Sequence, residues 1–282
     1  MKQINWYPGH MAKAKRLLTE QLRRVDLVIE LCDARLPYSS RNPDLDQLAG
    51  GKARILLLNK ADLAAQDLTD AWIHRFRSDG IRSEAICSEK LKASDAIKWI
   101  QKETEDSVRR AADRGIRKTV RAMVVGVPNV GKSTFINRLH GGSIARTGDS
   151  PGVTKSNQWI RIHPFLELMD TPGLLWPRLE DQTAARRLCY IGTVRDEVVD
   201  QEELAMNLLD ELAAEYPQSL QDRFHLKDLS LRGVPLLEAV CRERGYLLRG
   251  GDFDYSRGCS AVLDEFRGGK MGRITLEKPD SK

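Results

Sequence analysis

The chain has 282 residues, of which 41% are hydrophobic, and a formal net charge of +5 at pH 7. This length holds one α/β domain and a smaller one, and the charge is a mild basic bias that excludes a long basic tail. Neither a membrane span nor a signal peptide is visible, and the five cysteines show no metal-site spacing, so we expect a cytoplasmic protein with reduced thiols and no membrane partner.

The N-terminal segment is basic and helical in pattern. Residues 1–25 contain six Lys or Arg and one acidic residue, and 12–24 place apolar residues on one side of a predicted helix with basic residues opposite. A second basic run spans 109–121. Such clusters suit RNA phosphates, although charge alone slightly favours ordinary solvated helix faces.

Predicted strands alternate with helical stretches through the first 170 residues. We expect these strands at about 25–32, 54–59, 82–87, 119–125 and 165–170. The alternation predicts an α/β fold with a doubly wound, mostly parallel sheet. Ligands of such sheets bind at the carboxyl ends of the strands.

Two guanine-type motifs follow the second and third strands. The first is Asn59-Lys60-Ala61-Asp62, in which the Asp62 carboxylate can accept hydrogen bonds from the ring N–H and the amine of guanine, a pair of donors that adenine lacks. Alone, this segment could be an ordinary turn. The second, Ser88-Glu89-Lys90, is similar to the S-A-K loop of guanine-nucleotide proteins, whose backbone contacts guanine O6 and whose lysine packs on the base. Glu89 replaces the usual alanine.

A phosphate-binding loop follows the fourth strand. Gly126-Val127-Pro128-Asn129-Val130-Gly131-Lys132-Ser133 matches the pattern G-x-x-x-x-G-K-[ST], and a predicted helix continues from Thr134. A chance glycine turn is the alternative, but the strand before the loop and the helix after it provide the context that the motif requires. We expect Lys132 to reach the β- and γ-phosphates and Ser133 to ligate Mg²⁺.

A γ-phosphate sensor follows the fifth strand. Asp170-Thr171-Pro172-Gly173 fits D-x-x-G, which places Asp170 near Mg²⁺ and the Gly173 N–H on the γ-phosphate. Thr154, in a strandless stretch upstream, is the candidate for the second Mg²⁺ hydroxyl. Loss of the γ-phosphate would release both segments, as in GTPase switches. In isolation, DTPG could be an ordinary turn.

The pattern after Gly173 is helical. We expect helices at 198–214 and 236–244, and a last helix that begins with Asp252 as its cap and runs to Phe266. The apolar stripes of these helices predict a small all-α core. The chain then divides into a nucleotide-binding domain at 1–178 and a helical domain at 179–282.

The order of the motifs carries a resemblance. NKAD, SEK, the phosphate loop, the switch threonine and DTPG follow one another as in circularly permuted GTPases. The segments WYPGHM (6–11) and DARLPYSSRNP (33–43), with 264–267 and 269–273 near the end, resemble signatures of the ribosome biogenesis GTPase A (YlqF-like) family. This resemblance implies a permuted P-loop fold, GTP and GDP as ligands, and a monomer that binds the rRNA and proteins of the large ribosomal subunit late in assembly. It makes the helical domain an RNA- or ribosome-binding one.

The resemblance also implies a catalytic group outside the D-x-x-G motif. Leu174 occupies the position where many small GTPases have a water-orienting glutamine. We expect slow hydrolysis that the ribosomal subunit accelerates, with His10 positioning the water. His10 could instead pin an N-terminal turn or contact RNA. Asn129 is similar to the asparagine that holds K⁺ in potassium-activated GTPases, or it is a loop-capping amide.

Two other functions remain to be compared with a ribosome assembly GTPase. The missing glutamine leaves open a non-hydrolysing, GTP-sensing RNA-binding module. A signalling or membrane-trafficking GTPase is disfavoured by the permuted order, the basic N-terminus and the absence of a lipidation motif in this sequence.

Overall fold

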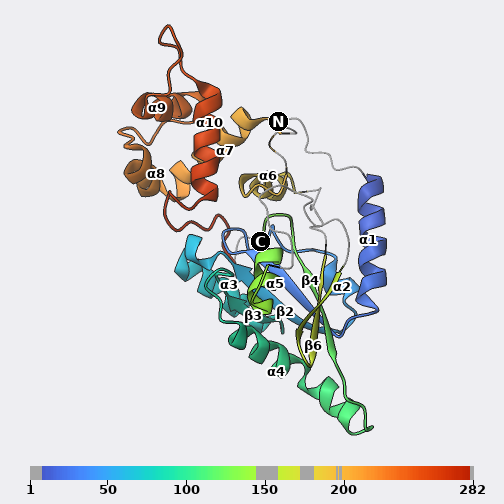
Figure 1. Cartoon of the computed structure of the whole chain (residues 1–282). Coiled ribbons are helices and arrows are strands. Elements are labelled where there is room, and N and C mark those ends of the chain that lie inside the picture. The colour runs from blue at the N-terminus through green and yellow to red at the C-terminus, as the bar shows by residue number, and fades with distance from the viewer. Residues whose placement is uncertain (1–7, 144–157, 172–180, 195, 197–198, 280–282) are drawn as a thin grey trace.

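The structure is a computed structural model that describes residues 8–143, 158–171, 181–194, 196 and 199–279. A sheet covered by helices stands beside a group of C-terminal helices (Figure 1). This arrangement confirms the expected α/β sheet followed by a helical part. Within the described residues, no helix combines the length and the apolar character that crossing a membrane requires.

The described residues form a six-stranded sheet with the order β3-β2-β1-β4-β6-β5. Neighbouring strands are parallel except for the antiparallel pair of β5 and β6. The strands are β1 (Leu27–Asp33), β2 (Ala53–Asn59), β3 (Arg82–Ala85), β4 (Val120–Val125), β5 (Gln158–His163) and β6 (Leu166–Asp170). The prediction of a mostly parallel sheet is therefore confirmed.

Strand β5 is the one that the sequence analysis missed. It lies at the edge of the sheet, where Ile160 is buried and Trp159 is 38% exposed. The guanidinium of Arg121 lies 5.2 Å from the centre of the Trp159 ring. An edge strand with one solvated face alternates polar and apolar residues, so it lacks the apolar run that marks the buried strands.

Helices cover both faces of the sheet. They are α1 (Pro8–Leu22), α2 (Leu45–Leu48), α3 (Gln66–Ser78), α4 (Ala93–Ala112) and α5 (Lys132–His140). Successive residues of a strand point to opposite faces. Ile29 of β1 accordingly shares a buried cluster with Phe135 of α5 and Ile100 of α4, whereas its neighbour Val28 shares another with Leu18 of α1. This two-sided cover is the doubly wound arrangement.

The described C-terminal helices are α6 (Gln182–Tyr190), α7 (Gln201–Glu215), α8 (Pro217–Phe224), α9 (Val234–Arg244) and α10 (Tyr255–Arg267). Helices α7, α9 and α10 match the three predicted ones to within a few residues, whereas the sequence analysis did not predict α6 or α8. The predicted cap of the last helix is wrong, because the Asp254 side chain caps α10 by accepting from the Arg257 N–H at 3.0 Å. Asp252 lies in a short turn closed by a bridge between Leu247 and Phe253, which delays the start of the helix.

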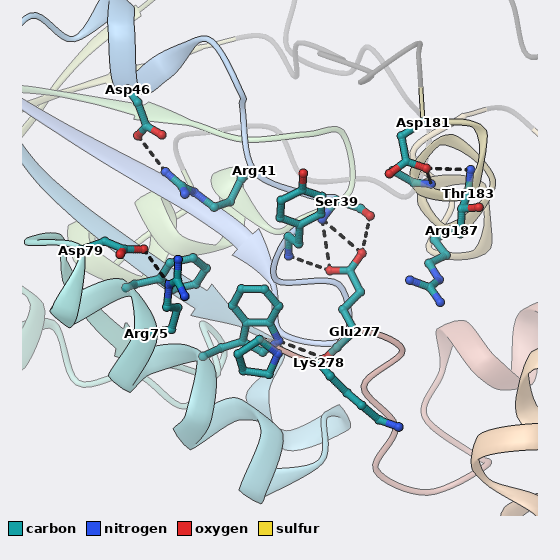
Figure 2. A pocket seen from close by; sticks show the side chains of 15 residues that line it. Ser39, Arg41, Asp46, Arg75, Asp79, Asp181, Thr183, Arg187, Glu277 and Lys278 are labelled. Carbon is teal, nitrogen blue, oxygen red and sulfur yellow. Dashed lines mark hydrogen bonds and ion pairs between the residues drawn. The ribbon is translucent and has the colours of Figure 1, made fainter. Parts of the chain in front are cut away.

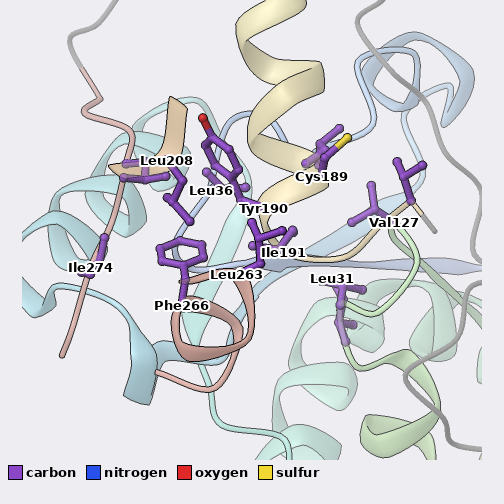
Figure 3. Close-up of a cluster of buried hydrophobic side chains, with 14 of the residues drawn as sticks. Leu31, Leu36, Val127, Cys189, Tyr190, Ile191, Leu208, Leu263, Phe266 and Ile274 are labelled. Atoms are coloured by element: carbon purple, nitrogen blue, oxygen red, sulfur yellow. The ribbon is translucent and has the colours of Figure 1, made fainter. Parts of the chain in front are cut away.

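One buried cluster runs from the sheet into these helices. Leu31 of β1, Tyr190 of α6 and Phe266 of α10 all belong to this cluster, part of which is drawn in Figure 3. The rings of Tyr190 and Phe266 meet edge to face, with their centres 6.3 Å apart. The aromatic pair thus lies in a core that both parts of the chain share. The division at residues 178 and 179 stays a prediction, and that boundary lies outside the described residues.

The end of the chain returns to the sheet. The Ile274 N–H donates to the Leu63 carbonyl and the Leu276 N–H to the Arg35 carbonyl, each at 3.0 Å. The Glu277 carboxylate then accepts from the backbone of Tyr38 at 2.6 Å and from the backbone and hydroxyl of Ser39 (Figure 2). These contacts fasten the loops after β1 and β2 to the C-terminal segment.

Glu277 is a buried acid in a polar setting. It lies beside a cavity of about 420 Å³ that Tyr38, Arg187 and Asp181 also line. Burial raises the pKa of Glu277 to about 7, and Asp181 acts in the same direction, while the hydrogen bonds from Ser39 and the charge of Arg187 oppose this rise. The folded protein therefore binds more protons at this group than the unfolded chain does between pH 4.5 and about 7.

This difference predicts a pH dependence of stability. The contribution of Glu277 to the free energy of unfolding is full below pH 4.5 and is lost as the pH rises through about 7. Glu277→Gln should remove this pH-dependent part of the free energy of unfolding, which is at most about 3 kcal/mol between pH 4.5 and about 7. Urea unfolding at about pH 5 and about pH 8 measures it. Glu215→Gln, which removes a solvent-accessible carboxylate paired with Lys278, is the control, and equal slopes in both variants would contradict the assignment.

Candidate nucleotide site

The predicted nucleotide motifs meet at one edge of the sheet. NKAD begins at the end of β2, the Ser88 loop follows β3, the phosphate loop follows β4, and Asp170 ends β6. These strands are parallel, so their carboxyl ends lie together. This edge is where α/β sheets of this kind bind ligands.

The phosphate loop depends on two glycines. A Cβ at Gly126 would lie 2.5 Å from the Leu31 carbonyl oxygen of β1, so only glycine permits this approach. Gly131 has a φ of 99° and is the N-cap of α5, and a Cβ there would overlap the Asn59 amide. The N–H groups of the first turn of α5 therefore follow a residue without a side chain and can donate hydrogen bonds to an anion.

Lys132 lies within the curl of this loop. Its side chain is buried, and its ammonium donates to the carbonyls of Gly126 and Val127 at 3.0 Å each. These contacts hold the positive charge at the N-terminal end of α5, where the helix dipole also favours an anion. The position fits the predicted role of Lys132 towards nucleotide phosphates.

Asn59 joins the three loops that are predicted to contact the nucleotide. Its amide nitrogen donates to the Val130 carbonyl at 2.7 Å, and its amide oxygen accepts from the N–H and the hydroxyl of Ser88, both at 2.9 Å. The side chain is 2% exposed. These contacts make Asn59 an organising residue of the site, and its predicted contact to the nucleotide stays a prediction.

Lys60 and Asp62 are placed differently around the same turn. Lys60 adopts a left-handed backbone with a φ of 59°, and its ammonium donates to the Asn129 carbonyl at 2.9 Å. Its stem therefore runs beside the phosphate loop, where it can pack on a base. The Asp62 carboxylate is about one third exposed and lies 3.8 Å from the Lys90 ammonium. Asp62 is thus accessible to a ligand.

A cavity of about 280 Å³ lies between these loops. Its volume is near the lower end of the range for small-molecule pockets, which suits a base. It brings together most of the residues predicted for guanine recognition and adds Leu63, Cys87 and Arg267. The residues that line it are Asn59, Lys60, Asp62, Leu63, Cys87, Ser88, Glu89, Gly131, Thr134 and Arg267.

A buried ion pair that the sequence analysis did not assign lies behind this cavity. Arg35 donates to both carboxylate oxygens of Asp33, at 2.9 and 2.8 Å. Burial alone would raise the pKa of Asp33, but the charges of Arg35 and Lys60 hold it well below its usual range. Both residues belong to the segment 33–43, which was noted above as a family signature. That resemblance marked the segment but indicated no chemical role for either residue.

The predicted Mg²⁺ ligands are only partly described. Ser133 lies in the first turn of α5, and the backbone of Asp170 pairs with Val124 at the end of β4, so both approach the phosphate loop. Thr154 and Gly173 lie outside the described residues. The described residues contain no group of three or more His, Cys, Asp or Glu that could hold a metal by itself. This donor set fits Mg²⁺ that is bound mainly by nucleotide phosphates.

Asn129 and His10 were predicted for K⁺ and for catalysis. Asn129 has a φ of 61°, and its amide nitrogen donates to the Gly192 carbonyl at 2.6 Å. This contact ties the phosphate loop to the turn after α6, and the K⁺ role stays a prediction. His10 lies in the first turns of α1 by its backbone, and its side chain is outside the described part of the chain.

Comparison with known proteins identifies the family. A family model described as 50S ribosome-binding GTPase matches residues 121–230. The chain is 44% identical to Ribosome biogenesis GTPase A of Bacillus cereus over 98% of this chain and 94% of that protein. It is 34% identical to Mitochondrial ribosome-associated GTPase 1 of Mus musculus over 97% of this chain and 90% of that protein. The chain belongs to the ribosome biogenesis GTPase A family.

Solved structures of the ribosome biogenesis GTPase A family have the same fold. A GDP-bound structure of TM YlqF has a TM-score of 0.67 and 26% identity, covering 94% of this chain and all of that one. A GNP-bound YlqF from T. maritima has a TM-score of 0.66 and 26% identity, covering 95% of this chain and 99% of that one. The likeness includes the C-terminal helices. Membership makes the protein a GTP-hydrolysing enzyme with a role in ribosome assembly.

The position of Asp62 predicts a change in base preference. Xanthine has a carbonyl where guanine has its amine, so an amide nitrogen in place of the carboxylate donates to xanthine and opposes guanine. Asp62→Asn should lower GDP affinity by about a hundredfold or more and raise the affinity for xanthosine diphosphate. Titration calorimetry with both nucleotides measures this. Asp79→Asn, at the end of α3, should change neither affinity, and an unaltered preference in Asp62→Asn would show that another group reads the base.

Proposed function

We propose that this protein is a GTPase that binds the large ribosomal subunit and promotes a late step of its maturation, acting as a monomer in the cytoplasm. The observation that carries the proposal is the Asn59 junction, which assembles NKAD, the Ser88 loop and the phosphate loop into one site. The name of the matching family model and the names of the relatives support the subunit as the partner.

Basic surfaces support contact with rRNA. Arg16 and Arg23, in or just after α1, are exposed. The end of α4 projects away from the sheet (Figure 1), and Arg114 and Arg117 are exposed in the turn that follows it. Exposed arginines on two separated elements suit the phosphate backbone of a folded RNA, and binding through them weakens as salt rises.

In the proposed mechanism the chain positions GTP and neutralises its charge. Asp62 and the Ser88 backbone face the base, Lys132 faces the β- and γ-phosphates, and the N–H groups at the N-terminus of α5 donate to the phosphate oxygens. Ser133, Asp170 and Thr154 would hold Mg²⁺, which offsets the charge that develops on the transferred phosphoryl group. Lys90 and Glu89 border the base, with Val130 and Thr134 beside the phosphates. The Gly173 N–H reports the γ-phosphate.

His10 positions the attacking water in this proposal. His10→Ala should leave GTP affinity unchanged and reduce subunit-stimulated hydrolysis by about a hundredfold or more, since a hundredfold is the lower end of what one acid–base group contributes. GTP turnover with and without purified large subunits measures this. His140→Ala, at the exposed end of α5, is the matched control. Full stimulation in His10→Ala would refute the assignment, and no hydrolysis in the wild type would favour a GTP-sensing RNA-binding module.

K⁺ beside Asn129 is the remaining part of the proposal. A monovalent cation at this position would offset charge between the phosphates during transfer. Turnover should be faster in KCl than in NaCl at equal ionic strength, and Asn129→Ser should remove the difference. Equal rates of the wild type in the two salts would exclude K⁺ from the mechanism.

A further inference from the structure

One residue of the base cavity comes from the C-terminal helices. Arg267, the last residue of α10, lines the cavity together with Lys60 and Asp62. The other lining residues belong to segments between 59 and 134, so Arg267 is separated from them by more than a hundred positions in the sequence. No nucleotide motif includes it.

Arg267 is held by a dense set of contacts. Its guanidinium donates to both carboxylate oxygens of Asp196 at 2.7 Å each, and to the carbonyls of Tyr190 and Cys189 at 3.1 Å each. The side chain is 21% exposed. A guanidinium is a rigid plane whose donors lie along its edge. Because these acceptors take four of the five N–H donors along that edge, what the residue chiefly offers to a ligand is its planar face and its aliphatic stem.

A purine base has the complementary shape. Its edge carries the groups that Asp62 reads, and its flat faces stack on aromatic rings or on guanidinium planes. Asp196 neutralises much of the charge of Arg267, which favours stacking over attraction to a phosphate. We propose that Arg267 is a base-contacting residue that packs against the guanine and completes a pocket that the nucleotide motifs leave open on this side.

The same contacts connect the base pocket to the phosphate loop. The Gly192 carbonyl accepts from the Asn129 amide at 2.6 Å, and a Cβ at Gly192 would lie 3.4 Å from Arg267 Nε and 3.6 Å from Asn129 Nδ2. The turn after α6 therefore packs against both residues. It follows that a displacement of α10 removes a wall of the base pocket. Since coupling is reciprocal, guanine nucleotides stabilise the docked position of the C-terminal helices.

The inference rests on the proposed guanine site and is tested on the full chain by nucleotide affinity. Arg267→Ala should weaken GDP and GTPγS equally, by about tenfold, because the contact is to the base. Arg267→Lys keeps the charge but lacks the plane, so it should lose nearly as much. The matched control is Arg223→Ala, which removes an equally close pair of contacts to Glu265 on the same helix, at a position that does not line the cavity.

Thermal unfolding of each variant separates the loss of a contact from the loss of the fold. Lower affinity in Arg267→Ala and Arg267→Lys, with wild-type affinity in a comparably destabilised Arg223→Ala, supports the inference. Wild-type affinity in Arg267→Ala, or an equal loss in Arg223→Ala, overturns it. A wild-type protein that binds GDP no better than ADP would instead overturn the guanine site itself, so the two failures are distinguishable.

Discussion

The buried ion pair of Asp33 and Arg35 connects the nucleotide edge of the sheet to the C-terminal helices. Beyond its two contacts to Asp33, Arg35 donates to the carbonyls of Phe266 and Arg267 at 2.9 and 3.3 Å. These carbonyls belong to the last turn of α10, where a helix carries partial negative charge, and the Phe266 carbonyl also accepts from the Gly269 N–H at 3.1 Å. One guanidinium therefore donates both to the Asp33 carboxylate at the end of β1 and to backbone carbonyls at the end of α10. Removing either partner of such a pair costs about 3–5 kcal/mol, since a charge is left buried alone.

The base pocket is built on this pair from two directions. On one side the Lys60 ammonium lies 3.4 Å from Asp33, so the lysine of NKAD is part of the same network. On the other side, Arg35 donates to the carbonyls of Phe266 and Arg267 at the end of α10. These contacts hold the backbone from which the Arg267 side chain extends. The pair thus links the two walls of the pocket, whereas the apolar cluster around Tyr190 and Phe266 supplies the burial that stabilises the arrangement.

The sequence predicted the parts of the site that depend on local pattern. The parallel strands, the phosphate loop and NKAD were placed correctly, because apolar runs and glycine-containing turns are read from neighbouring residues. The contacts of Asn59 could not be predicted in this way, since Val130 and Ser88 come from other segments and only the fold brings them together. Arg267 lies in the segment 264–267, which was noted as a family signature. Its proposed role could not be predicted from the sequence, because it depends on the contacts to Asp196 and on the packing of α10.

The permuted order explains why the end of the chain matters for the site. The loops after β1 and β2 are formed early in the chain, and Ile274, Leu276 and Glu277 hold them from its last described residues. These contacts join positions more than two hundred residues apart, so their entropic cost is met only when the chain between them is folded. The turn that carries Asp62 is therefore held in place from the far end of the chain, through the hydrogen bond between the Ile274 N–H and the Leu63 carbonyl. Contacts of this kind tie the geometry of the proposed guanine pocket to the docking of the C-terminal segment.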